Sequence, residues 1–86
     1  MPLGDTQALR AWAERDNPHY RLWRRVELWI LGLDNTPWQA PSVPLTFNVG
    51  EPTEIRYAEL PEADGVKVFY EHEHRSGLVN LLHVGR

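Results

Sequence analysis

The chain has 86 residues, no cysteine and a formal net charge of −3, as expected for one small domain held together by a hydrophobic core. The lack of cysteine excludes disulfide bonds and thiolate chemistry. The acidic balance argues against a protein that coats nucleic acid through charge alone. The longest apolar run, residues 28–33, is too short to span a membrane, and the N-terminal residues lack signal-peptide features. We therefore expect a cytoplasmic protein with no membrane partner.

Two helices are predicted at the start of the chain. Asp5 is a suitable N-cap for a helix over residues 6–15. Asn17 can cap a second helix over residues 18–33, with Pro18 in its first position. The apolar residues that recur at helical spacing are Ala8, Leu9, Trp12 and Ala13 in the first helix, and Leu22, Val26, Trp29, Ile30 and Leu33 in the second. These stripes predict a helical hairpin over residues 5–33, with Trp12 and Trp29 in the core.

The second helix also carries a basic cluster on the side opposite its apolar stripe. Its members are Arg21, Arg24 and Arg25. Charge runs of this kind are most often solvated helix faces, and they also suit contact with phosphate or with an acidic protein. We take the three arginines as candidate partner-binding residues.

A proline-rich connector over residues 34–53 is expected to wrap around the core, because apolar residues such as Trp38 alternate with its prolines. Strands are then predicted over residues 54–60, 66–74 and 78–84, with turns between them. Short connections imply antiparallel pairing. The expected fold is a single α+β domain over residues 1–86, with two N-terminal helices packed on a three-stranded antiparallel meander over residues 54–86.

The turn between the last two strands allows two registers. A three-residue loop, 75–77, places Tyr70 opposite Leu82, whereas a two-residue loop, 76–77, places Tyr70 opposite His83. A slip of one residue moves a side chain to the other face of the sheet. The second register gathers Tyr70, His72, His74 and His83 on one face. The sequence leaves both registers open.

Three of the four histidines lie in this last hairpin, and they support two kinds of chemistry. His72 and His74, two residues apart on a strand, can chelate a metal with His83 as third ligand, although a solvated rim of alternating Glu and His is the simpler interpretation and no cofactor is predicted. Cleavage of RNA instead needs a base, an acid and a cation over the phosphate. The candidate catalytic residues for that reaction are His72, His83, Tyr70 and Arg86, and the candidate phosphate-binding residues are Arg56, Lys67 and Arg75.

The stretch Gly65-Val66-Lys67-Val68-Phe69-Tyr70, followed by a turn and by an apolar strand that ends in Val84-Gly85-Arg86, resembles the RelE/ParE-type toxin superfamily of bacterial toxin–antitoxin systems. The resemblance covers residues 54–86, and the helices match by pattern only. It implies a protein that cuts mRNA on the ribosome or poisons DNA gyrase, and that a cognate antitoxin neutralises. By position, it implies that Arg56, Lys67 and Arg86, with His83 beside the last, serve an RNA-cutting site.

We therefore predict a RelE/ParE-like toxin-type protein of bacterial or phage origin, either a ribosome-associated mRNA endoribonuclease or a degenerate relative. Its expected partners are an antitoxin protein and either the ribosome with mRNA or another protein target. The alternative is a small non-enzymatic protein-interaction module, encoded by a phage or mobile element. Such a module should expose aromatic side chains ringed by charges.

Overall fold

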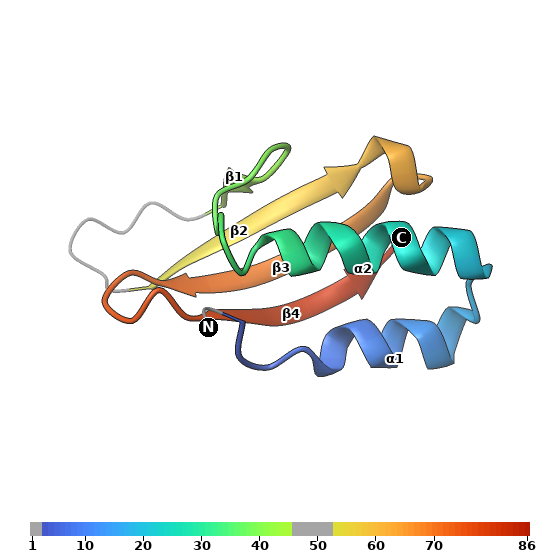
Figure 1. Ribbon diagram of the computed structural model, residues 1–86, viewed down its shortest axis with the longest axis horizontal. Helices are drawn as coiled ribbons and strands as arrows, with labels where there is room; N and C mark the ends of the chain where they lie inside the picture. Colours follow the sequence, from blue (N-terminus) through green and yellow to red (C-terminus); the bar gives the residue numbers. More distant parts are fainter. Residues whose placement is uncertain (1–2, 46–52) are drawn as a thin grey trace.

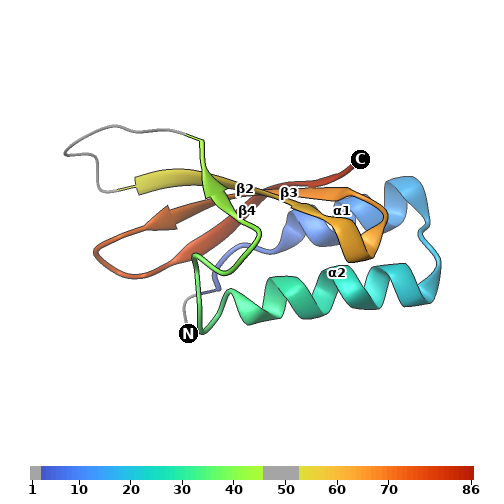
Figure 2. The same cartoon turned by 90° about the horizontal axis from the view of Figure 1, so that it is seen from above.

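The computed structural model of the protein describes residues 3–45 and 53–86 (Figure 1). Its elements in chain order are α1 (Gln7–Asp16), α2 (Tyr20–Gly32), β1 (Val43–Pro44), β2 (Thr53–Leu60), the short 3-10 helix η1 (Pro61–Ala63), β3 (Val66–Glu73) and β4 (Val79–Gly85). The strands form one antiparallel sheet in the order β1-β2-β3-β4. Both helices lie on the same side of the sheet, with α1 running along β4 (Figure 2). The α+β class is confirmed, but over the described residues the sheet has four strands where three were predicted.

The helix ends differ from those predicted. Asn17 adopts left-handed backbone angles (φ 44°, ψ 56°) and donates its N–H to the Ala13 carbonyl, so it ends α1 and does not start α2. His19 caps α2 instead, because its Nδ1 accepts the Arg21 N–H at 3.2 Å. Pro18 therefore lies outside both helices. Asp5 is also not the N-cap of α1, which is Thr6, although Asp5 Oδ1 accepts the Gln7 N–H at 2.9 Å.

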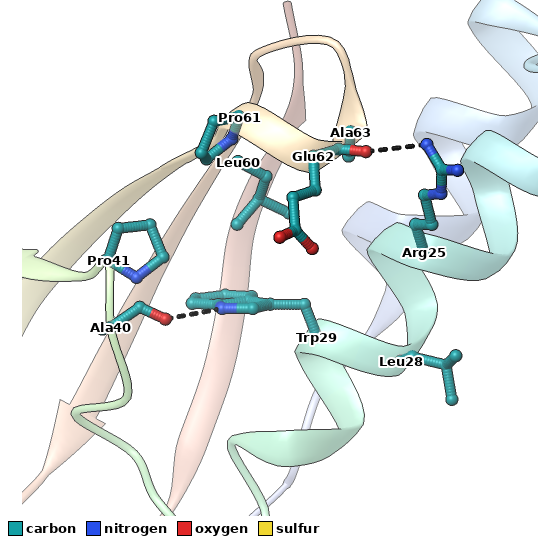
Figure 3. Close-up of a pocket in the computed structure, with 9 residues that line it drawn as sticks. All are labelled: Arg25, Leu28, Trp29, Ala40, Pro41, Leu60, Pro61, Glu62 and Ala63. Atoms are coloured by element: carbon teal, nitrogen blue, oxygen red, sulfur yellow. Dashed lines mark hydrogen bonds between the residues drawn. The ribbon is translucent and has the colours of Figure 1, made fainter.

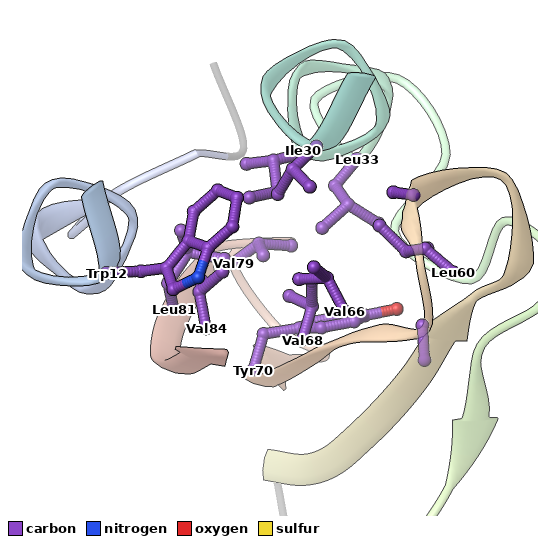
Figure 4. Close-up of a cluster of buried hydrophobic side chains, with 13 residues drawn as sticks. Trp12, Ile30, Leu33, Leu60, Val66, Val68, Tyr70, Val79, Leu81 and Val84 are labelled. Carbon is purple, nitrogen blue, oxygen red and sulfur yellow. The ribbon is translucent and has the colours of Figure 1, made fainter. Parts of the chain in front are cut away.

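The core lies between the helices and the inner face of the sheet (Figure 4). Along β3, alternate residues are buried toward the helices, and the residues between them lie on the outer face. The buried hydrophobic residues are Trp12, Val26, Ile30, Leu33, Ala58, Leu60, Ala63, Val66, Val68, Tyr70, Val79, Leu81 and Val84. Trp12 is thus in the core as predicted, while Trp29 packs against the core and is only partly buried.

The β3–β4 hairpin follows neither predicted register over its whole length. Near the turn, Tyr70 pairs with Leu81, whereas the neighbouring Phe69 pairs with His83. Leu82 is therefore an extra residue in a β-bulge, and it is 48% exposed. The register of the three-residue loop holds only on the side of the bulge away from the turn, where Phe69 pairs with His83 and Lys67 pairs with Gly85. Because of the bulge, His83 lies on the outer face, across the sheet from Tyr70.

A short extended segment lies at each edge of the sheet. Residues 3–5 run parallel to β4: the Gly4 N–H donates to the Val79 carbonyl at 2.7 Å, and the Leu81 N–H donates to the Asp5 carbonyl at 2.8 Å. On the opposite edge, β1 pairs with β2 through its two residues, with Pro44 opposite Arg56. An extended segment therefore precedes α1 in the fold. Among the described residues, no helix combines the length and the apolar character that crossing a membrane requires.

Candidate functional site

Four polar side chains come together where β2 begins and β3 ends, and we call them the polar cluster: Glu54, Arg56, His72 and His74. Antiparallel pairing places Glu54 directly opposite His72. His74 follows His72 by two residues, directly after β3. Glu54 Oε1 lies at the centre of the group, 3.6 Å from His72 Nδ1, 3.6 Å from His74 Nε2 and 3.0 Å from Arg56 Nη1.

The two histidines of the polar cluster differ in their surroundings. His72 is 8% exposed, and its Nδ1 is buried without a hydrogen-bond partner. The side chain of His74 is 52% exposed. Their ring centroids are 5.1 Å apart, and the indole of the exposed Trp38 lies 6.4 Å from the His72 ring. One imidazole thus faces the interior and the other is open to solvent.

Arg56 is held in place by the connector. Its Nε donates to Ser42 Oγ at 3.1 Å, its Nη2 donates to the Ser42 carbonyl at 3.2 Å, and its Nη1 donates to Glu54. All three guanidinium nitrogens therefore have a partner within the protein. Arg56, which the sequence proposed as a phosphate ligand, ties the connector to β2.

The charges in the polar cluster act on its titratable groups. Burial raises the pKa of Glu54, but the hydrogen bond and charge of Arg56, with the charge of His74, outweigh it and leave the pKa below its ordinary value of 4.5. Burial lowers the pKa of His72 below its ordinary value of 6.5, and the nearby Glu54 carboxylate offsets this only in part. A carboxylate and a neutral imidazole are thus the favoured forms near neutral pH.

The remaining predicted catalytic residues lie elsewhere. Tyr70 is fully buried, and its hydroxyl donates to the Pro37 carbonyl at 2.5 Å. His83 lies on the outer face, with its ring 6.0 Å from that of Phe69. Arg86 Nη2 lies 3.4 Å from Asp64 Oδ2. The structure therefore keeps His83 and Arg86 apart from His72. Tyr70 shares the buried face of β3 with His72, but its hydroxyl is committed to the Pro37 carbonyl.

The other predicted phosphate-binding residues are also separated from the polar cluster or open to solvent. Lys67 lies on the outer face of β3, opposite Gly85 of β4. Arg75 is exposed in the turn that follows β3. No single surface collects Arg56, Lys67 and Arg75.

The predicted partner-binding arginines lie on α2. Arg24 pairs with Glu27, and Arg25 Nη1 donates to the Glu62 carbonyl at 3.0 Å. Arg21 is exposed. The same helix presents large exposed side chains, with exposed fractions of 70% for Tyr20, 52% for Leu28 and 50% for Leu31. At 100° per residue, these three fall within one outward arc with Arg24. We call Tyr20, Arg24, Leu28 and Leu31 the α2 outer face.

An apolar groove of about 550 Å³ lies between α2, the connector and η1 (Figure 3). The Trp29 indole N–H donates to the Ala40 carbonyl at 3.0 Å within it, and Arg25 bonds to Glu62 at its rim. None of its lining residues belongs to the polar cluster. Of the described residues that line the groove, Arg25 and Glu62 are the ionisable ones, and neither a histidine nor a second carboxylate stands beside them.

Sequence reasoning missed Glu54 as a member of the site. The signal was present, because the turn over residues 61–65 makes Leu60 face Val66, and continuing that register places Glu54 opposite His72.

No protein-family model, curated protein or solved structure matches this chain. The polar cluster, the exposed surfaces and the topology are therefore the features that bear on its function.

Proposed function

We propose that this is a RelE/ParE-like toxin-type protein that acts in the cytoplasm by binding a macromolecular target, as a relative without nuclease chemistry. The supporting observation is the topology: a helical hairpin covers one side of an antiparallel sheet, and the last hairpin, β3–β4, carries the residues of the resemblance. Residues 3–5 add an extended segment before α1. This arrangement suits the superfamily, whose members usually begin with a β-strand.

The placement of the polar residues favours binding over RNA cleavage. Cleavage requires a base, an acid and a cation within hydrogen-bonding reach of one phosphate. Tyr70 is used in the core, His83 lies across the sheet from His72, and Arg86 lies beside Asp64. The guanidinium of Arg56 is fully engaged by Ser42 and Glu54. Each of these side chains contacts other parts of the protein, and together they do not line one substrate-binding site.

The α2 outer face is the surface that best suits a partner. Exposed Tyr20, Leu28 and Leu31 provide apolar contact area, and exposed Arg21 adds positive charge beside it, while Arg24 is paired with Glu27. Aromatic and apolar anchors surrounded by charge are typical of protein interfaces. The complementary partner is an acidic protein segment with apolar side chains. The same surface supports the second candidate, a non-enzymatic interaction module without toxicity.

Tightly induced expression in bacteria tests the proposal. We expect growth arrest with the wild-type chain, no new cleavage ends in cellular RNA, and relief of arrest in a Leu28→Glu, Leu31→Glu double variant. Lys67→Ala, which changes a charge on the other side of the sheet, is the matched control and should still arrest growth. Circular dichroism of each purified variant verifies the fold.

Two results would contradict this proposal. Normal growth with abundant folded wild-type protein in several hosts would exclude a toxin and leave the interaction module. Arrest accompanied by RNA cleavage, and abolished by alanine at His72 and His74 together, would instead establish a nuclease at the polar cluster.

A further inference from the structure

We propose that the polar cluster binds a divalent first-row transition metal ion through Glu54, His72 and His74. The inference does not depend on the toxin-type function, because it rests only on the geometry and chemistry of these side chains. One ligand atom from each residue lies within 4.8 Å of the others. Among the described residues, this is the group of His, Asp and Glu side chains that meets that condition.

The separations between the ligand atoms suit a tetrahedral ion. Zinc binds imidazole nitrogen and carboxylate oxygen at about 2.0–2.2 Å, so its tetrahedral ligands lie about 3.3–3.5 Å from one another. Glu54 Oε1 is 3.6 Å from His72 Nδ1 and 3.6 Å from His74 Nε2. The side chain of His74 is half exposed, so a small rotation can bring its nitrogen closer to that of His72.

The buried nitrogen of His72 is a second and independent indication. His72 is 8% exposed, and its Nδ1 has no hydrogen-bond partner while it faces the Glu54 carboxylate. A buried polar atom without a partner is unfavourable. An ion between Glu54 and His72 would give this nitrogen the partner that it lacks.

Arg56 fits the site as an outer partner of the carboxylate. Ligating carboxylates commonly accept hydrogen bonds from neighbouring groups that orient them, and a carboxylate has enough lone pairs for an ion and a donor together. Ser42 holds the guanidinium from the other side. The positive charge of Arg56 opposes that of the ion, so the site should bind less tightly than one without it.

The donor set selects the class of metal. Two imidazoles and one carboxylate suit zinc and its first-row neighbours, whereas calcium and magnesium prefer oxygen ligands alone. The sequence suggested His83 as third ligand, but the β-bulge places His83 on the outer face, and Glu54 takes that role. Three protein ligands would leave the fourth position of a tetrahedral ion for water.

A competition titration tests the site. The full chain, freed of metal by dialysis against a chelator, is titrated with Zn²⁺ against a chromophoric chelator. We expect one ion per chain, at least a tenfold loss of affinity in His74→Ala and in Glu54→Gln, and unchanged affinity in the matched control His83→Ala. His74 is half exposed, so its removal should leave the fold intact, which circular dichroism verifies.

Imidazole NMR signals of the wild-type chain give a readout that requires no variant. Zn²⁺ should shift the signals of His72 and His74 and leave those of His19 and His83 in place. Absence of binding, equal affinity in wild type and His74→Ala, or shifts centred on His19 or His83 would each overturn the proposal.

Discussion

The phenol of Tyr70 donates a hydrogen bond of 2.5 Å to the backbone carbonyl of Pro37, and so joins β3 to the connector 33 residues earlier in the chain. Tyr70 is fully buried, and the Trp29 ring meets it edge-on at 6.3 Å. A residue that the sequence suggested for proton transfer therefore fastens the connector over the core.

Tyr70→Phe should destabilise the protein by about 1–3 kcal/mol, because it leaves the carbonyl of buried Pro37 without its partner. Urea denaturation followed by tryptophan fluorescence measures the change. Tyr57→Phe is the matched control: its hydroxyl bonds to exposed Glu59, so the loss should stay within about 0.5 kcal/mol. Equal effects in the two variants would contradict the structural role of Tyr70.

Asn17→Ala should cost about 1–2 kcal/mol, since alanine is disfavoured in the left-handed conformation that ends α1. Asn17→Gly should be much milder, because glycine adopts that conformation freely. Thermal unfolding of both variants provides the comparison. If alanine proved no worse than glycine, the break between α1 and α2 would not depend on the backbone of this residue.

Acidification should lower the free energy of unfolding. The folded state holds the pKa of His72 below 6.5 and that of Glu54 below 4.5, so the unfolded chain binds more protons as the pH falls through these values. The contribution of His72 decreases first, and that of Glu54 follows at lower pH. Denaturation in urea at a series of pH values between about 8 and 4 measures the dependence.

A double variant, His72→Gln with Glu54→Gln, identifies the groups behind this pH dependence. It removes both side chains from titration, so its stability should vary less with pH than that of the wild type. An unchanged pH dependence would assign the effect to other residues.

Zinc should stabilise the folded chain against heat. At a free concentration one hundred times the dissociation constant, a ligand specific to the folded state adds about 2.7 kcal/mol. A chelator should reverse the rise in melting temperature. His74→Ala should show a much smaller rise at the same zinc concentration, and His83→Ala the full one. A rise of equal size in both variants would place the ion elsewhere.

Local patterns were sufficient to predict the helices and the three long strands. The apolar spacing around Trp12 and Val26 and the alternation along β3 report directly which side of each element is buried. The ends of the helices were less predictable, because Asn17 can either end one helix or cap the next. Strand β1 was missed because two residues leave no periodic pattern.

The candidate site was harder to predict, because it depends on pairing between strands. Glu54 lies next to His72 only because of the β2–β3 register. His83 lies on the opposite face of the sheet only because of the bulge at Leu82. A bulge shifts the pairing by one residue without a clear mark in the sequence. Composition therefore indicated the histidines, while only the fold could select those that share a face.

Along the described chain, residues 3–5 pair with the first part of β4, Val79 to Leu81, at one edge of the sheet, and the opposite edge carries a strand of two residues, one of them Pro44. Proline offers no N–H to an incoming strand. Short or covered edges of this kind protect against the strand-by-strand stacking that builds amyloid. The folded protein should therefore resist fibril formation even in concentrated solution, and removal of residues 3–5 should make it vulnerable.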